Sequence, residues 1–207
     1  MHLSPRFEDA LVYATQIHAH QHRKRTDIPY ISHLLAVAAI ALEHGATEDE
    51  AIGALLHDAG EDAGGCGRIA DIRVRFGDAV AEIVNGCTDT VENPKPEWTK
   101  RKLNYIAHLS AAPASVRLVS AADKLHNARS ILSDFRRIRE EVWCRFNKGS
   151  GCTLWYYRAL ADTFQQVGPQ SLAEELDRVV TDIERESNGG QRILDPPTPA
   201  EPQTKSH

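Results

Sequence analysis

Apolar residues recur at intervals of three and four along almost the whole of this 207-residue chain. This spacing gathers them on one face of an α-helix, whereas a half-buried strand requires strict alternation. Helix breakers follow or precede the patterns, as at Gly45, Gly77 and Pro113. The spacing predicts helices over residues 8–20, 33–44, 48–58, 67–76, 78–87, 97–109, 114–132, 136–146, 154–167 and 171–186. We therefore expect an all-α fold, a single compact multi-helix bundle.

The composition changes near the C-terminus and once within the chain. Residues 187–207 are rich in glycine and proline and show no periodic apolar face. Such a segment buries too little apolar surface to offset the entropy lost on ordering. We expect one folded domain over 1–186 and a flexible tail over 187–207. Segment 88–96 contains two prolines and few apolar residues, which predicts an exposed loop.

The overall charge excludes some classes of protein. A net charge of −5 argues against a general nucleic-acid binder, which needs a basic surface to displace counterions from phosphates. The longest apolar run, residues 34–42, is too short to span a bilayer, and no signal-like segment opens the chain. We expect a cytoplasmic protein without membrane or nucleic-acid partners. Its four cysteines lack CxxC spacing, so we expect reduced thiols. The oligomeric state is left open.

Four side chains able to bind a metal or move a proton occur within six residues at the end of one predicted helix. They are His57, Asp58, Glu61 and Asp62, and they follow an apolar Leu-Leu pair. Residues three and four apart share a helix face, so His57 and Glu61 should be neighbours, as should Asp58 and Asp62. A metal bound by His57 would therefore have carboxylates beside it.

Two further candidate ligands lie elsewhere in the chain. His33 begins a predicted helix, and Asp123 interrupts an apolar helix. Together with His57 and Asp58 they make two imidazoles and two carboxylates. This mixed nitrogen and oxygen set suits Mn²⁺, Fe²⁺ or Zn²⁺ better than Ca²⁺, which prefers oxygen alone.

Asp123 also has an interpretation without a metal. A carboxylate buried in an apolar helix requires compensation, which a salt bridge to Lys124 or Arg129 would supply. Adjacent residues on a helix do not face each other, so this argument disfavours Lys124 as the partner.

Basic residues cluster around the candidate ligands although the chain is acidic. The run Arg23-Lys24-Arg25 precedes His33, and Lys124 follows Asp123. Local positive charge of this kind fits a small polyphosphate ligand. The alternative is an ordinary solvated charge run. We do not interpret the nearby His18, His20 and His22 as a second metal site.

These motifs resemble those of the HD phosphohydrolase superfamily, which has a histidine, then a His-Asp pair, then an aspartate. The finer pattern is similar to the hydrolase half of RelA/SpoT-type stringent-response enzymes. The motifs that carry this likeness are Arg23-Lys24, Pro29-Tyr30-Ile31-x-His33, Glu61-Asp62 and Ala122-Asp123-Lys124-Leu125-His126-Asn127. The likeness runs from about residue 7 to about residue 186 and implies a small alarmone hydrolase with the helical HD-domain fold.

The resemblance implies an activity and a role for each site residue. The enzyme would be a Mn²⁺-dependent 3′-pyrophosphohydrolase that converts ppGpp or pppGpp to GDP or GTP plus pyrophosphate, without synthesising the alarmone. His33, His57, Asp58 and Asp123 would bind the metal. Glu61 and Asp62 would orient or deprotonate the attacking water. The substrate contacts would come from Arg23, Lys24, Tyr30, Lys124, Asn127 and Tyr157.

Three alternatives stay open at this point. An adenosine alarmone, ppApp or pppApp, would use the same metal and phosphate contacts. Another HD-domain nucleotide phosphohydrolase, such as a deoxynucleoside monophosphatase, would not need the Glu61-Asp62 and Arg23-Lys24 elements. A catalytically idle alarmone-binding module would not need the whole ligand set.

Overall fold

The computed structural model describes residues 2–90, 92 and 94–196, with the side chain of Asp62 left out. Helices account for nearly all of its regular structure, and within the described ranges the only β-type pairing is an isolated bridge between His22 and Pro29. The α-helices are α1 (Pro5–Ile17), α2 (Ile31–Glu43), α3 (Glu48–Leu56), α4 (Ala59–Asp62), α5 (Gly65–Phe76), α6 (Asp78–Cys87), α7 (Trp98–Ala111), α8 (Ala114–Ile138), α9 (Gly149–Val167) and α10 (Gln170–Asn188). A 3₁₀ helix, η1 (Arg139–Arg145), follows α8. The expected all-α fold is confirmed.

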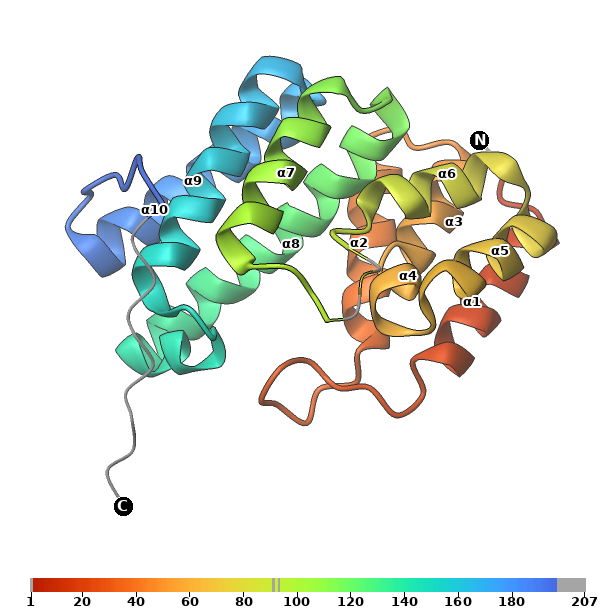
Figure 1. The fold of residues 1–207 in the computed structure, drawn as a ribbon, viewed down its shortest axis with the longest axis horizontal. Coiled ribbons are helices and arrows are strands. Elements are labelled where there is room, and N and C mark those ends of the chain that lie inside the picture. Colours follow the sequence, from red (N-terminus) through yellow and green to blue (C-terminus); the bar gives the residue numbers. More distant parts are fainter. Residues whose placement is uncertain (1, 91, 93, 197–207) are drawn as a thin grey trace.

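The long helix α8 lies at the centre of the bundle. It packs against α2, α3 and α6 on one side and against α9 and α10 on the other. Figure 1 shows α1, α3, α5 and α6 gathered on one side of the molecule and α7, α9 and α10 on the other. Residues on α8 can therefore contact both halves of the chain, which places Asp123 between them.

The turn from α2 to α3 shows how local sequence positions the candidate site. Gly45 has φ of +84°, a conformation that glycine adopts without steric cost. Thr47 and Glu50 then form a capping box, since each side chain bonds the backbone of the other residue. Helix α3 therefore begins at Glu48, and the His57-Asp58 pair follows directly after its last turn.

Several predicted helix boundaries differ from the structure, and α9 begins at Gly149 rather than at residue 154. Residues 136–146 do not form a separate α-helix, because α8 continues to Ile138 and the segment after it is the 3₁₀ helix. Arg139 at the junction has φ of +52°, which ends the α-helical geometry there. The first helix ends at Ile17 rather than at residue 20, and α4 is a separate short helix after Asp58.

The C-terminal boundary also moves slightly. Helix α10 extends to Asn188, two residues into the predicted tail, and Ile193 packs against the core. The flexibility of the remaining tail stays a prediction, and residues 197–207 lie outside the described part. None of the helices in the described ranges is both long and apolar enough to cross a membrane. The four cysteines, all within the described ranges, form no disulfide bonds.

Candidate metal centre and active site

The four predicted metal ligands come from three different helical segments and meet at one point. His33 lies in the first turn of α2, His57 and Asp58 join α3 to α4, and Asp123 lies in the middle of α8. Both histidines and Asp123 are buried, with exposures of 1%, 2% and 5%. The fold thus brings together residues that are up to 90 positions apart in the sequence.

The Nε2 atoms of the two histidines face the two carboxylates. His33 Nε2 lies 3.2 Å from Asp123 Oδ1 and 3.6 Å from Asp58 Oδ2. His57 Nε2 lies 3.0 Å from Asp58 Oδ2 and 3.6 Å from Asp123 Oδ1. Neither Nε2 atom has a hydrogen-bond partner, although both are buried. Unsatisfied buried nitrogens are rare, and a divalent cation among these four groups would satisfy both of them.

The two buried carboxylates of the cluster also require a positive charge nearby. Burial alone would lower the pKa of His57, but the carboxylates of Asp58 and Asp123 outweigh it and hold the pKa well above its usual value. Burial raises the pKa of each carboxyl group, yet nearby positive charge leaves both values well below the usual range. Two ionised carboxylates therefore attract either a proton on His57 or a metal ion.

Neighbouring side chains orient the two carboxylates. The Tyr30 hydroxyl donates a hydrogen bond to Asp58 Oδ2 at 2.5 Å. Lys124 Nζ donates to Asp123 Oδ2 at 2.6 Å, and Asn127 Nδ2 donates to Asp123 Oδ1 at 2.5 Å. Groups that orient metal ligands in this way also tune the affinity of the site.

The pairing of Lys124 with Asp123 corrects the argument that adjacent helical residues cannot meet. That argument concerns the directions of the Cβ atoms, whereas the four-carbon stem of lysine is long enough to curl back. Its ammonium group also lies over the Tyr105 ring, 5.2 Å from the centroid. Arg129, the other candidate partner, bonds Glu175 of α10 instead.

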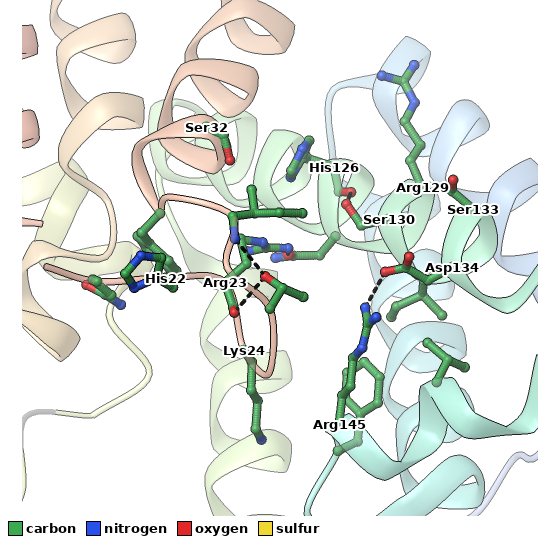
Figure 2. A pocket seen from close by; sticks show the side chains of 18 of the residues that line it. His22, Arg23, Lys24, Ser32, His126, Arg129, Ser130, Ser133, Asp134 and Arg145 are labelled. Atoms are coloured by element: carbon green, nitrogen blue, oxygen red, sulfur yellow. Dashed lines mark hydrogen bonds and ion pairs between the residues drawn. The ribbon is translucent and has the colours of Figure 1, made fainter. Parts of the chain in front are cut away.

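A pocket of about 760 Å³ adjoins the ligand cluster along α8. Figure 2 shows its basic and polar lining, with the segment of His22, Arg23 and Lys24 facing residues of α8. The lining includes the predicted substrate contacts Arg23, Lys24, Tyr30, Asn127 and Tyr157. Lys124 is not part of this lining, and its predicted contact with phosphates stays a prediction.

Arg23 connects the pocket to the candidate metal ligands. Its guanidinium donates to Asn127 Oδ1 at 2.7 Å and lies over the Tyr30 ring, 5.9 Å from the centroid. Asn127 in turn donates to Asp123, so one hydrogen-bonded chain runs from Arg23 to a carboxylate of the cluster. The next two basic residues contact the segment that follows α8, since Lys24 Nζ lies 3.2 Å from Asn147 Oδ1 and Arg25 donates to the Cys144 carbonyl.

The two predicted water-handling residues lie in α4, which begins directly after the predicted ligand Asp58. The Glu61 carboxylate accepts a hydrogen bond from Lys95 Nζ at 2.6 Å, and its side chain is one-quarter exposed. The Asp62 side chain lies outside the described part of the chain. Lys95 belongs to the predicted exposed loop, and nothing in the sequence pattern singled it out.

The pocket also has polar lining residues that the sequence reasoning did not select. Asp134, about three helical turns beyond Asp123 on α8, forms an ion pair with Arg145 on one wall of the pocket (Figure 2). His126 lies between that wall and the ligand cluster, with its Nδ1 atom 2.7 Å from His33 Nδ1. His126 lies three residues after Asp123 on α8, and Ser130 four residues after His126, so helical spacing could have indicated both. Asp134 and Arg145 had no such signal in the sequence.

Comparison with known proteins assigns the chain to a family. A sequence model of the HD domain matches residues 10–146, well over half of the chain. The chain belongs to the HD-domain family. This HD-domain chain is 36% identical over 138 residues to the guanosine-3′,5′-bis(diphosphate) 3′-pyrophosphohydrolase MESH1 of Xenopus tropicalis, covering 65% of this chain and 72% of the relative. The MESH1 of Danio rerio is 34% identical over 134 residues, covering 63% and 69%.

A solved structure of another protein has a similar fold. It is described as a metazoan ortholog of SpoT that hydrolyzes ppGpp and plays a role in starvation responses. The two chains share 26% identity with a TM-score of 0.69, over 86% of this chain and 96% of that one. The protein lmo0812 of Listeria monocytogenes matches with a TM-score of 0.65 and 31% identity, over 73% and 97% of the two chains.

Proposed function

We propose that this HD-domain chain is a metal-dependent 3′-pyrophosphohydrolase of ppGpp and pppGpp. The observation that carries the proposal is the pair of buried Nε2 atoms of His33 and His57, which make no hydrogen bond and face the carboxylates of Asp58 and Asp123. We infer the substrate from the relatives that are named for ppGpp hydrolysis. The site of action would be the cytoplasm, in alarmone degradation during the stringent response.

We assign the metal to the same four side chains. Mn²⁺ is our first choice because neutral imidazoles and carboxylates share the donor set, and Fe²⁺ or Zn²⁺ would also suit it. When bound, the ion lowers the pKa of a water molecule and neutralises negative charge on the reacting phosphate. Tyr30, Lys124 and Asn127 hold the carboxylates in place through the hydrogen bonds described above.

The remaining residues handle the proton and the charge of the substrate. Glu61, three residues after Asp58 in the sequence, accepts a proton from the attacking water as general base, with Asp62 assisting. The water oxygen bonds to the phosphorus next to the ribose, and the bond from that phosphorus to the 3′ oxygen breaks. The 3′ oxygen takes up a proton, which gives GDP or GTP and pyrophosphate. Arg23 and Lys24 stabilise the negative charge of the pyrophosphate, while Asn127 and Tyr157 border the nucleotide in the pocket.

A substrate panel tests this proposal against its alternatives. Protein stripped of metal with EDTA and then supplied with Mn²⁺ is assayed with ppGpp, ppApp, deoxynucleoside monophosphates and NADPH, and the products are identified. We expect turnover of ppGpp only after Mn²⁺ is restored. Binding of ppGpp without turnover would instead support an idle binding module, and preferred turnover of a monophosphate would support a different HD enzyme.

A further inference from the structure

The second ring nitrogen of His33 contacts another histidine. His126 lies on α8, three residues after Asp123, and its Nδ1 atom is 2.7 Å from His33 Nδ1. The two rings are tilted by 41°, with centroids 4.8 Å apart. His126 is not one of the four proposed metal ligands, and its Nδ1 atom is occupied by this contact.

The distance between the two nitrogens limits the protonation of both rings. Only one proton fits between two nitrogens 2.7 Å apart, since two N–H groups would repel each other and two lone pairs would make no bond. A neutral His33 that offers its Nε2 lone pair to a metal must carry its proton on Nδ1. His126 Nδ1 must then accept this proton's hydrogen bond, which leaves the proton of neutral His126 on Nε2.

The other histidine of the site is held differently. His57 Nδ1 lies 2.8 Å from the Ala54 carbonyl oxygen, which can only accept. The backbone therefore fixes neutral His57 in the tautomer whose Nε2 lone pair faces the carboxylates. The partner of His33 is an imidazole, which could donate or accept. His33 can therefore offer Nε2 to a metal only when Nδ1 of His126 carries no proton and accepts the hydrogen bond from His33.

We propose that His126 is a positioning residue that fixes His33 in the tautomer that binds the metal. The inference rests on the proposed metal site but not on the proposed substrate. Metal-bound histidines ordinarily donate their second N–H to a carboxylate, carbonyl or water, and loss of such a partner lowers metal affinity by about 10- to 100-fold. His126 also lines the pocket beside Asn127. It therefore links the metal ligands to the pocket.

Metal affinity measured without substrate tests the role of His126. Metal-free wild type, His126→Leu and His126→Asn are titrated with Mn²⁺, with His108→Leu as a control because His108 is an exposed histidine on α7. Asn keeps an oxygen that can accept from His33, whereas Leu cannot. We expect Mn²⁺ affinity to fall about 10-fold or more in His126→Leu and to stay close to wild type in His126→Asn and the control. Unchanged affinity in a folded His126→Leu would overturn the proposal.

Assignment of the histidine tautomers in the wild type is an independent test, because it does not depend on whether any variant folds. Imidazole ¹⁵N chemical shifts are measured on protein loaded with diamagnetic Zn²⁺. We expect the proton of His33 on Nδ1 and that of His126 on Nε2. A proton on Nδ1 of His126 would refute the inference. Normal Mn²⁺ binding with the expected tautomers but no hydrolysis of ppGpp would refute the proposed function and leave this inference standing.

Discussion

Lys95 Nζ lies 2.6 Å from Glu61 Oε1, so the loop between α6 and α7 is attached to the acid that we assign as general base. Lys95 is about half exposed, and an ion pair of this kind contributes less than about 1 kcal/mol to stability. The contact is therefore better suited to orienting a carboxylate than to holding the fold together.

Replacement of Lys95 should lower the rate without affecting folding. We expect Lys95→Met to reduce kcat/KM for ppGpp by about 10-fold because Glu61 loses its orienting partner, while the melting temperature changes little. Lys100→Met is a matched control, since Lys100 is an exposed lysine at the start of α7. Steady-state kinetics and thermal melting of both variants give the comparison. Equal kinetics for the two variants would show that the ion pair has no role in turnover.

Metal content should separate the ligands from the general base. Asp58→Ala removes a carboxylate that faces both imidazoles, so we expect it to lose the bound ion and the activity together. Glu61→Gln keeps the four ligands, so we expect normal metal content and a loss of rate of about 100-fold or more. Elemental analysis beside kinetics makes the distinction. A similar loss of metal in both variants would mean that Glu61 is itself a ligand.

Arg23 should contribute to turnover more than its neighbour in the same basic run. We expect Arg23→Ala to lower kcat/KM for ppGpp by about 10²-fold, because it removes a positive charge that stabilises the pyrophosphate. Arg25→Ala is the control, since Arg25 bonds the Cys144 carbonyl and is not part of the pocket lining. Metal content is measured as well, because Arg23 reaches Asp123 through Asn127. If both substitutions changed kcat/KM equally, residues 23–25 would be better explained as a solvated run of charges.

The raised pKa of His57 predicts how the stability of the metal-free protein depends on pH. A proton held more tightly in the folded state stabilises the fold fully below the unfolded pKa of about 6.5, and this contribution is lost as pH rises through the folded pKa. The lowered pKa values of Asp58 and Asp123 affect the stability of the fold only in stronger acid. Burial, His33 and Arg23 lower the pKa of His126 to about 4, which reduces stability only below pH 6.5.

The corresponding measurement is thermal melting in EDTA and in Mn²⁺ at pH 6.5 and pH 8.5. We expect the metal-free protein to melt at a lower temperature at pH 8.5, and Mn²⁺ to remove that difference because it replaces the proton. His57→Gln should lack the dependence in EDTA. Metal-free wild type that melted at the same temperature at both pH values would contradict the assignment.

The sequence predicted the helices and the ligand cluster because both depend on short-range patterns. Apolar spacing indicated α2, α3 and α6 with small errors at their ends, and the His-Asp motif indicated residues that the fold brings together. Pairings set by the tertiary fold had no such signal. Arg158, for example, is fully buried in α9 and bonds Glu184 of α10, and neither residue belongs to a recognisable motif. The contact of Lys95 with Glu61 likewise depends on the path of a loop without periodicity.

The most direct test of the account is hydrolysis of ppGpp by the Mn²⁺-loaded protein in water enriched in ¹⁸O. We predict equal amounts of GDP and pyrophosphate, with the heavy oxygen in the pyrophosphate because water bonds to phosphorus. Addition of EDTA should stop the reaction. Release of orthophosphate, incorporation of the label into GDP, or the absence of turnover with Mn²⁺ bound would contradict the proposed 3′-pyrophosphohydrolase activity.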